Sequence, residues 1–121
     1  MYQIELFKEH PLDIQREQLF KIIARAENTE WGKQHGYASM GSIRDFQERV
    51  PISGYEGMKP YIDRLLQGED NVLWPGTIRW FAKSSGTTSD KSKFIPVSKD
   101  ALENCHFRGG KDTLAIYFSN Y

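Results

Sequence analysis

Cysteine is nearly absent from this chain, since Cys105 is the only one among 121 residues. An intrachain disulfide is therefore excluded, and a short chain without a disulfide framework is typical of a reducing compartment. The N-terminal segment has no basic residues followed by an apolar core, so a signal peptide is not expected. No apolar run approaches the roughly 20 residues that a membrane span needs. These absences predict a cytoplasmic protein with no membrane partner.

An excess of charge of either sign is also missing, because 16 Lys and Arg residues balance 16 Asp and Glu residues. A general nucleic-acid binder would normally show a basic face, and binding to an anionic membrane surface would need a Lys/Arg cluster. Neither feature is present, so we expect neither nucleic acid nor a membrane surface as a partner. The length is sufficient for one small domain with a modest core.

Helical periodicity dominates the first half of the chain. Apolar residues recur at helical spacing from Pro11, which fits the first turn of a helix, to Ala26. The residues expected to face a core from this helix are Leu19, Ile22, Ile23 and Ala26. Shorter helices are predicted over 29–35, closed by Gly36, and after the capping-box residue Ser42.

A further helix is predicted over 59–67, with Gly68 as its stop. Its buried stripe is expected at Tyr61, Ile62, Leu65 and Leu66. Asp63 and Arg64 are interpreted as part of its solvated face.

The pattern changes to that of strands after residue 76. β-Branched and aromatic residues predict strands over 77–82 and 94–97, and Ser98 is placed to cap a closing helix. Gly109 and Gly110 weaken the middle of that helix. Its apolar residues continue without a stop signal, so we expect the chain to be a fragment with exposed apolar surface and a tendency to self-associate. The side chains concerned are Leu114, Ile116, Tyr117 and Phe118.

The fold class expected from these elements is α/β, in this chain an α+β arrangement in which a helical N-terminal layer leads into a β-hairpin. The hairpin encloses a polar loop in the stretch WFAKSSGTTSDKSKFIPVS. Compact hydroxyl donors, glycine and lysine suit a phosphate chain, which needs converging donors and positive charge. The loop residues that would supply them are Ser84, Ser85, Gly86, Thr87, Thr88 and Lys93.

The loop also admits roles that do not involve phosphate. The Walker A pattern fails because Gly86 has no second glycine five positions on, and the Rossmann pattern is absent. AKSSG loosely matches a nucleophile elbow, which would make the protein a serine hydrolase with Ser84 as nucleophile, although TTSDKSK is a poor helix start. The plain alternative is a solvated hairpin loop in a non-catalytic interaction module.

SSGTT followed by DKSKFIPVS resembles the first ATP motif of adenylate-forming enzymes. The closer similarity is to the auxin-responsive promoter family, also called the Gretchen Hagen family of acyl-acid amido synthetases, in its bacterial branch. The similarity extends upstream through VLWPGTIRWFAKSSGTT, RVPISGYEGMKPYIDRLLQGE and TEWGKQHGY. Residues 1–121 resemble the N-terminal part of the larger adenylate-forming domain.

The resemblance implies a ligase that uses ATP and Mg²⁺ to activate a carboxylic acid as an acyl-adenylate. An amine such as an amino acid then takes the acyl group. By position, residues 84–88 would cradle the β and γ phosphates, and Lys93 matches the trailing lysine of the motif. In-line attack on the α-phosphorus requires the leaving pyrophosphate to be held and neutralised.

Two departures from the family pattern are visible. Asp90 stands where plant members tend to have a small residue. The family's proteins are several times longer, so their second ATP motif, acyl pocket and C-terminal domain have no counterpart here. We therefore expect the chain alone to be inactive, and the sequence identifies no catalytic residue.

No other residues form a convincing site. The histidines His10, His35 and His106 lack a second ligand at metal spacing, so no metal site is predicted. Cys105 adjoins His106 on a predicted helix, where neighbours point about 100° apart, and is interpreted as a small buried residue. The tryptophans could form a base-stacking platform, but core packing is expected because each adjoins apolar residues. They are Trp31, Trp74 and Trp80.

Overall fold

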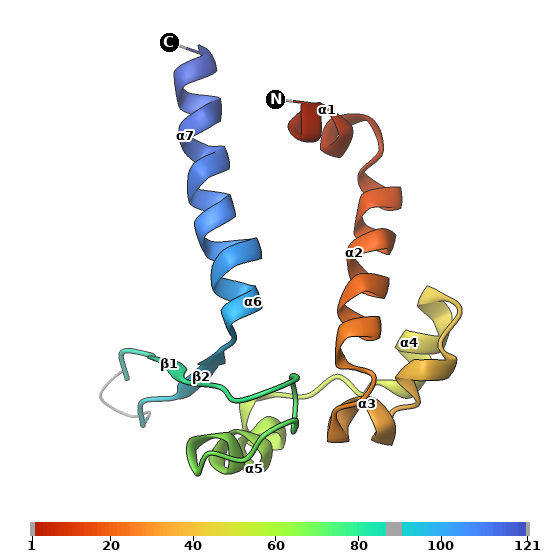
Figure 1. The fold of residues 1–121 in the computed structure, drawn as a ribbon, viewed down its shortest axis with the longest axis vertical. Coiled ribbons are helices and arrows are strands. Elements are labelled where there is room, and N and C mark those ends of the chain that lie inside the picture. The colour runs from red at the N-terminus through yellow and green to blue at the C-terminus, as the bar shows by residue number, and fades with distance from the viewer. Residues whose placement is uncertain (1, 87–90, 121) are drawn as a thin grey trace. The chain divides into compact units, whose positions relative to one another are not determined.

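The computed structural model describes residues 2–86 and 91–120. The chain divides into two compact units, Met1–Thr77 and Ile78–Tyr121. The first unit is helical, and the second contains a β-hairpin followed by a helix (Figure 1). This α+β arrangement confirms the expected fold class. In the described part of the chain, no helix is long and apolar enough to cross a membrane.

Two helices that meet at Pro11 open the first unit. Helix α1 spans Tyr2–Glu9, and helix α2 spans Pro11–Ala26 with its proline in the first turn, as predicted. Helix α1 was not predicted. It is eight residues long and packs against α2. So short a segment depends on tertiary packing for its stability rather than on its own periodicity.

Helix α3 (Glu30–Gln34) is held at both ends. Thr29 is 1% exposed, and its Oγ1 accepts a hydrogen bond from Gly32 N at 3.0 Å while donating to Ala26 O at 2.7 Å. At the other end Gly36 has a φ of +66°, the left-handed conformation predicted for the cap. One side chain therefore joins the start of α3 to the end of α2.

The next helical segments follow their predicted caps. A 3₁₀ turn, η1 (Tyr37–Ser39), precedes helix α4 (Ile43–Arg49). Asp45 N donates to Ser42 Oγ at 3.1 Å, and Ser42 N donates back to Asp45 Oδ2 at 3.0 Å, which confirms the capping box. Hydrogen bonds from the Gly41 N–H and from Ser42 hold the pKa of Asp45 below its usual value.

Helix α5 (Tyr55–Leu66) begins four residues before the predicted start at Lys59. Proline is usually confined to the first turn of a helix, and a start at Lys59 would have placed Pro60 there. In the structure Pro60 lies inside the helix, where its missing N–H removes only one backbone hydrogen bond. The helix stops at Gly68 as predicted, because the φ of +88° there does not continue a right-handed helix.

A closed turn over residues 71–76 follows α5. Asn71 has a φ of +56°, its N–H donates to Gly76 O at 3.2 Å, and its Oδ1 accepts from Gly76 N at 2.8 Å. The carbonyls of Asn71 and Val72 accept from Glu30 N and Trp31 N at 2.9 and 3.0 Å. The turn thus satisfies the first two N–H groups of α3.

The core of the first unit gathers around the end of α2. Its buried residues are Ile23, Ala26, Tyr37 and Met40, and the half-buried residues packed on them are Leu19, Phe20, Trp31, Phe46, Val50 and Trp74. Two predicted core residues are exposed, since Ile22 is 53% and Leu66 44% accessible. Each is adjacent to a buried residue, and a one-residue step on a helix turns a side chain by about 100°.

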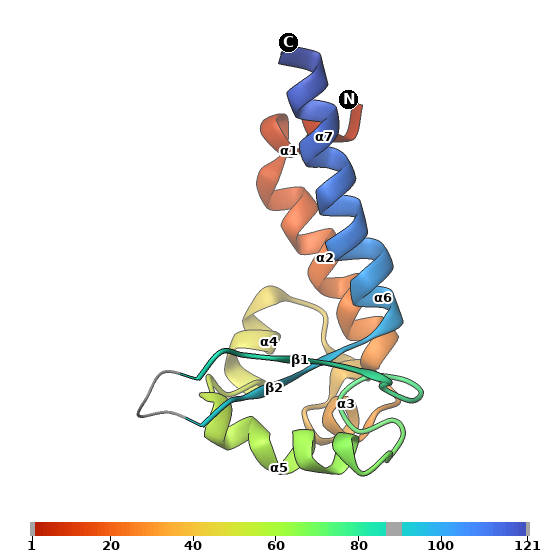
Figure 2. The same ribbon diagram turned by 90° about the vertical axis from the view of Figure 1, so that its left-hand side faces the viewer.

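The second unit starts with two antiparallel strands, β1 (Trp80–Lys83) and β2 (Phe94–Val97), which Figure 2 shows side by side. The second strand has its predicted bounds. The first begins three residues later and ends one residue later than predicted. The first strand is shorter than predicted because only four of its residues pair with residues of β2, which is itself four residues long.

Three consecutive helical segments close the chain. They are α6 (Lys99–Ala101), the π-helical η2 (Leu102–Phe107) and α7 (Arg108–Asn120). Ser98 Oγ accepts from Ala101 N at 3.0 Å, which confirms the predicted cap. Gly109 and Gly110 lie in the first turn of α7 and do not interrupt the helix.

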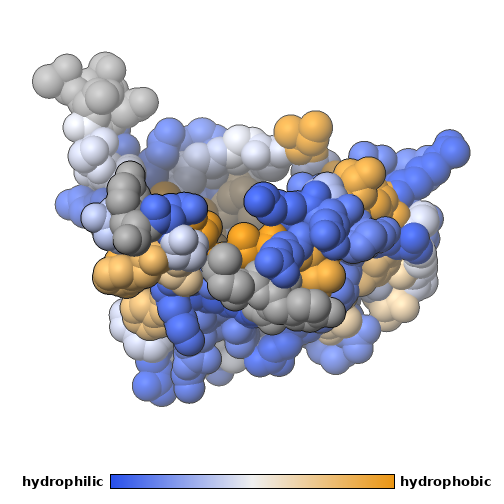
Figure 3. Space-filling view, turned by 90° about the horizontal axis from the view of Figure 1, so that it is seen from above, coloured by the Kyte–Doolittle hydropathy of each residue, from blue (hydrophilic) through white to orange (hydrophobic). Residues whose placement is uncertain are grey.

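The closing helix exposes most of its side chains. Cys105 is exposed, so its interpretation as a buried residue was wrong. Four apolar side chains predicted to be uncovered are exposed, by 44–73%: Leu114, Ile116, Tyr117 and Phe118. Figure 3 shows hydrophobic side chains, in orange, at the surface among hydrophilic ones.

Candidate phosphate-binding site

The hairpin carries the polar loop at its open end. The last strand pair joins Lys83 to Phe94, and the same register continues into Ser84 and Lys93. Ser84 N donates to Lys93 O at 2.9 Å, and Lys93 N donates to Ser84 Oγ at 2.9 Å. The Ser84 side chain thus takes the place of a carbonyl in the ladder. The loop proper begins at Ser85.

Ser84 is half-buried, and its side chain accepts a hydrogen bond from the backbone of Lys93. Because its oxygen accepts from an amide, its own O–H proton can be donated to an anion. A nucleophilic serine instead needs a general base within hydrogen-bond reach. Among the described residues the partner of Ser84 Oγ is a backbone N–H and not a histidine. The hydrolase interpretation therefore gains no support from this geometry.

The predicted phosphate ligands fall into two groups. Ser84 and Lys93 are half-buried at the base of the loop, while Ser85 and Gly86 are exposed beyond it. Thr87 and Thr88, like Asp90 of the same loop, lie outside the described residues. The structure therefore brings Ser84 and Lys93 together through two hydrogen bonds and places Ser85 and Gly86 next to them in an accessible position.

The donor set at the loop suits phosphate better than a bare metal ion. Hydroxyls, a glycine backbone and an ammonium donate hydrogen bonds and oppose negative charge. A metal ion needs oxygen, nitrogen or sulfur ligands gathered in one place. Within residues 2–86 and 91–120, no group of three or more His, Cys, Asp or Glu side chains could hold one.

Lys83 is a cation beside the loop that sequence reasoning did not assign. It precedes Ser84 directly, so the two side chains point to opposite faces of the hairpin. Its Nζ lies 6.0 Å from the centroid of the Phe94 ring, near the outer limit for a cation–π contact. The only signal in the sequence was its position next to the serine.

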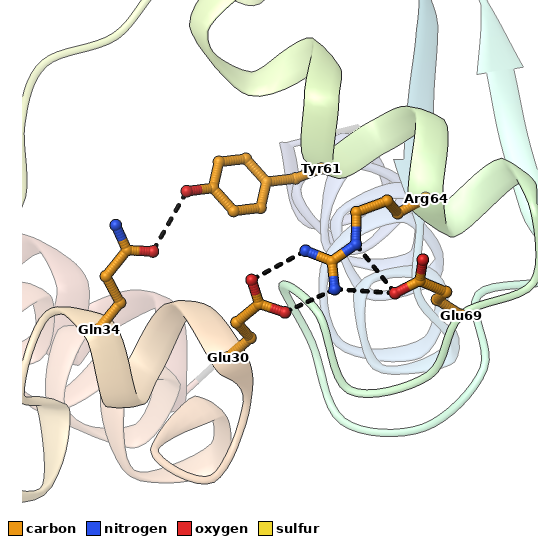
Figure 4. Close-up of polar contacts among 5 residues, drawn as sticks. All are labelled: Glu30, Gln34, Tyr61, Arg64 and Glu69. Atoms are coloured by element: carbon orange, nitrogen blue, oxygen red, sulfur yellow. Dashed lines mark hydrogen bonds and ion pairs between the residues drawn. The ribbon is translucent and has the colours of Figure 1, made fainter.

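A second polar cluster joins α5 to α3 (Figure 4). The guanidinium of Arg64 pairs in bidentate fashion with Glu30, at 2.8 and 2.6 Å, and also contacts Glu69 Oε2 at 2.9 and 2.8 Å. Beside it, Tyr61 OH donates to Gln34 Oε1 at 3.2 Å. The prediction that Arg64 lies on a solvated face was therefore incomplete, because the residue links two helices.

The charges of this cluster are mutually satisfied. The hydrogen bonds from Arg64 lower the pKa of Glu30, and those to Glu30 and Glu69 raise the pKa of Arg64. A site that binds a charged ligand would leave some of these groups to the ligand. We interpret the cluster as structural.

The tryptophans do not share one platform. Trp31 and Trp74 pack on the core of the first unit, as predicted. Trp80 in the second unit is 49% exposed, so its predicted core packing was wrong. Trp31 Nε1 donates to Tyr37 OH at 3.0 Å, and burial raises the pKa of that phenol.

The histidines occupy separate places. His35 lies against Trp31, with ring centroids 4.1 Å apart and its Nδ1 2.9 Å from the Trp31 carbonyl oxygen. His10 precedes α2, and His106 lies in the π-helical turn next to Cys105. His35 therefore has a local packing role.

Comparison with solved structures defines the class of protein. The chain is similar to the structure of the GH3.15 acyl acid amido synthetase, with a TM-score of 0.75 and 28% sequence identity. The similarity covers 85% of this chain and 19% of that one. The fold described above is therefore shared with part of an amido synthetase.

Residues 1–121 match the family model described as the GH3 family N-terminal domain, and the chain therefore belongs to the GH3 family. A probable indole-3-acetic acid-amido synthetase of Oryza sativa subsp. japonica, GH3.7, is 35% identical over 97 residues, 74% of this chain and 16% of the relative. The jasmonoyl–L-amino acid synthetase JAR4 of Nicotiana attenuata is 30% identical over 103 residues, 84% of this chain and 18% of the relative.

These comparisons confirm the resemblance to the amido synthetase family. The chain spans less than a fifth of the length of these two relatives and of the solved structure. Both relatives are plant proteins, so membership of a bacterial branch stays a prediction.

Proposed function

We propose that this chain is the N-terminal, phosphate-binding portion of an ATP-dependent acyl-acid amido synthetase. The observation that carries the proposal is the Ser84–Lys93 closure of the hairpin, which presents the start of SSGTT as an exposed loop in a GH3 family chain. The relatives support the class of reaction, since one is named as an indole-3-acetic acid-amido synthetase and the other as a jasmonoyl–L-amino acid synthetase.

The proposed reaction has two steps. A substrate carboxylate attacks the α-phosphorus of ATP, which releases pyrophosphate and forms an acyl-adenylate. The amine then attacks the acyl carbon and AMP leaves. Residues 84–88 would donate to the β and γ phosphate oxygens, and Lys93 would neutralise the charge that develops on the leaving pyrophosphate. Each hydrogen bond to a charged oxygen contributes about 1.5–3 kcal/mol.

Mg²⁺ belongs to the same proposal, as a Lewis acid that shares the charge of the phosphates. Among the side chains of the described loop residues, the hydroxyl oxygens of Ser84 and Ser85 are those that could contact the ion. The chain's part is then to bind and orient the phosphates.

The substrates of the whole enzyme and the inactivity of this chain alone are also proposals. We propose a small carboxylic acid and an amine as substrates of the whole enzyme, acting in the cytoplasm. This chain alone would not catalyse amide formation, because an acyl pocket and a second nucleotide-binding wall would come from the rest of the enzyme.

The proposal is tested by ATP–pyrophosphate exchange in an enzyme-length protein that contains this chain. Lys93→Ala and Thr87→Ala should each slow exchange by about tenfold or more, the equivalent of one charged hydrogen bond. Ser84→Thr, which keeps the hydroxyl, should retain more activity than Ser84→Ala. Lys91→Ala is the matched control, because Lys91 is an exposed lysine of the same loop with no proposed ligand role.

Unchanged exchange in both Lys93→Ala and Thr87→Ala would remove the phosphate-binding role of the loop. Covalent labelling of a peptide spanning residues 80–91 by a fluorophosphonate would point instead to the serine hydrolase. Loss of exchange in Lys91→Ala to the same degree would indicate that general charge, and not the motif, is responsible.

A further inference from the structure

The hydrogen-bond ladder of the hairpin ends in a side chain. A directly bonded pair in an antiparallel ladder exchanges two bonds between backbone N–H and C=O groups. Ser84 N donates to Lys93 O at 2.9 Å, as such a pair requires, but Lys93 N donates at 2.9 Å to the Ser84 hydroxyl. A side-chain oxygen that bonds to the backbone in this way competes with regular strand pairing. The closure of the hairpin beside the loop therefore depends on one side-chain atom.

The strand register brings the Ser84 and Lys93 side chains to the same face of the hairpin. Lys83 pairs with Phe94, so the next residues along the ladder, Ser84 and Lys93, stand directly opposite each other. Opposite residues project to one face, with Cβ atoms about 4.5–5.5 Å apart. Both residues are half-buried. The closure thus fixes the backbone from which the Lys93 ammonium extends, on the side of the Ser84 hydroxyl.

The two hydrogen bonds that the Ser84 hydroxyl can make would reinforce each other at an anion. Its oxygen accepts from Lys93 N, and its own proton can be donated to a phosphate oxygen. Donation to a charged oxygen makes the hydroxyl a better acceptor, by about 10–30% per bond in a chain of hydrogen bonds. Because coupling is reciprocal, an anion that strengthens the closure is itself bound more tightly by the closed hairpin.

We propose that Ser84 is a positioning residue that couples phosphate binding to the closure of the hairpin and thereby holds the Lys93 ammonium at the phosphates. The proposal rests on the proposed function, because it takes the loop as the phosphate site. It gives Ser84 a role that acts through Lys93. Ser85, exposed beyond the closure, would contact the phosphates independently.

A double-mutant cycle in ATP–pyrophosphate exchange tests this role in the enzyme-length protein. Ser84→Ala should slow exchange by about tenfold in the unmodified protein, but by less than about threefold in the Lys93→Ala background, where the positioned ammonium is missing. Ser84→Thr, which keeps the hydroxyl, should retain most of the rate. The control pair is Ser85→Ala with Lys93→Ala, whose losses should multiply. Losses that also multiply for Ser84 overturn the proposal, because Ser84 is then an independent ligand.

Hydrogen exchange of the Lys93 amide gives a readout that a purely structural role would leave unchanged. ATP and Mg²⁺, without the carboxylic acid, should slow exchange of this amide by about tenfold or more in the unmodified protein. The Ile95 amide, within the ladder, is the internal reference. In Ser84→Ala at saturating ATP the slowing should disappear. Slowing that persists in this variant comes from shielding by the nucleotide and contradicts the coupling.

Ser84→Cys provides a second variant in case Ser84→Ala does not fold. A thiol is close in size to a hydroxyl but is a weak acceptor, so this variant should also lose both the exchange rate and the response of the Lys93 amide. Values equal to those of the unmodified protein would overturn the proposal.

The unmodified enzyme-length protein separates this proposal from the proposed function. Absence of pyrophosphate exchange in that protein removes the proposed function and the role of Ser84 with it. Normal exchange together with multiplying losses removes the role of Ser84 alone.

Discussion

At the scale of single residues, Gly32 shows how closely two helices meet in the first unit. It is buried, and a Cβ built on it would lie 2.1 Å from Ala26 O and 3.0 Å from Glu27 Cα. The obstacle is backbone, which has no rotamer to change. Thr29 holds the same junction through its hydroxyl. The start of α3 therefore depends on the Thr29 cap and on the absence of a side chain at Gly32, three residues later.

Substitution Gly32→Ala should destabilise the protein by about 1–3 kcal/mol, the usual cost of overpacking a site that cannot relax. The free energy of unfolding from urea denaturation measures it. Gly57→Ala is the control, because the new Cβ meets only Ser53 Oγ, which can rotate away. That variant lies in a helix and should be neutral or more stable by up to about 1 kcal/mol. Equal losses in both variants would contradict the close approach as the cause.

At the scale of secondary-structure elements, α5 and α3 are joined by the ion pairs of Arg64. Its planar guanidinium meets both oxygens of Glu30 and one of Glu69, which fixes the relative rotation of the two helices better than a single contact would. Backbone bonds from Glu30 and Trp31 to the 71–76 turn hold the same end of α3. The stretch from Arg64 to the 71–76 turn therefore holds the start of α3, where Glu30 lies 34 residues before Arg64.

The Glu30 pair should make stability depend on pH. Arg64 lowers the pKa of Glu30 from its ordinary value of 4.5, so the stabilisation is complete above that value and is lost as the pH falls through the lowered pKa. Glu30→Gln should therefore cost stability at pH 7 and progressively less from about pH 5 downward. Urea unfolding at a series of pH values measures the difference.

Glu48→Gln is the matched control for this test, because Glu48 pairs with Arg44 within one exposed helix turn. Such pairs contribute little, so its cost at pH 7 should be smaller and should change less with pH. A cost of Glu30→Gln that stays constant down to about pH 3 would show that the carboxylate charge is not responsible.

At the scale of the whole molecule, the two units differ in how much apolar surface they cover. The first encloses a contiguous core, whereas the closing helix of the second leaves a stripe uncovered. Phe107, Leu114 and Phe118 recur at spacings of seven and four residues, which places them on one side of a helix. Such a stripe in a protein is normally covered by another surface.

The 121-residue chain should therefore self-associate through α7. Sedimentation at increasing concentration should show a rising average mass, and the double variant Leu114→Lys, Phe118→Lys should stay monomeric. Leu12→Lys is the control, because Leu12 is 78% exposed on α2 and lies outside the stripe. A monomer at all concentrations for the unmodified chain would show that the stripe does not drive association.

Local signals predicted much of the fold. The caps at Ser42 and Ser98, the helix-ending glycines at 36 and 68 and the second strand all lie where the sequence predicted them. Each depends on a few neighbouring residues. The errors at Ile22, Leu66 and Cys105 have another origin, because exposure depends on which distant segment covers a side chain. The start of α5 differs from the predicted one, and Pro60 lies inside the helix, where proline is unusual.

For the candidate site, residue order alone was enough to predict the composition of the loop, its place between two strands and the family to which it points. All three features depend on the order of the residues, and a sequence motif is defined by that order. The folded chain was needed to show that Ser84 closes the hairpin through its side chain and that Arg64 joins α5 to α3. Hydrogen bonds between residues far apart in the chain depend on the register of the strands and the packing of the helices. No short stretch of the sequence determines either of these.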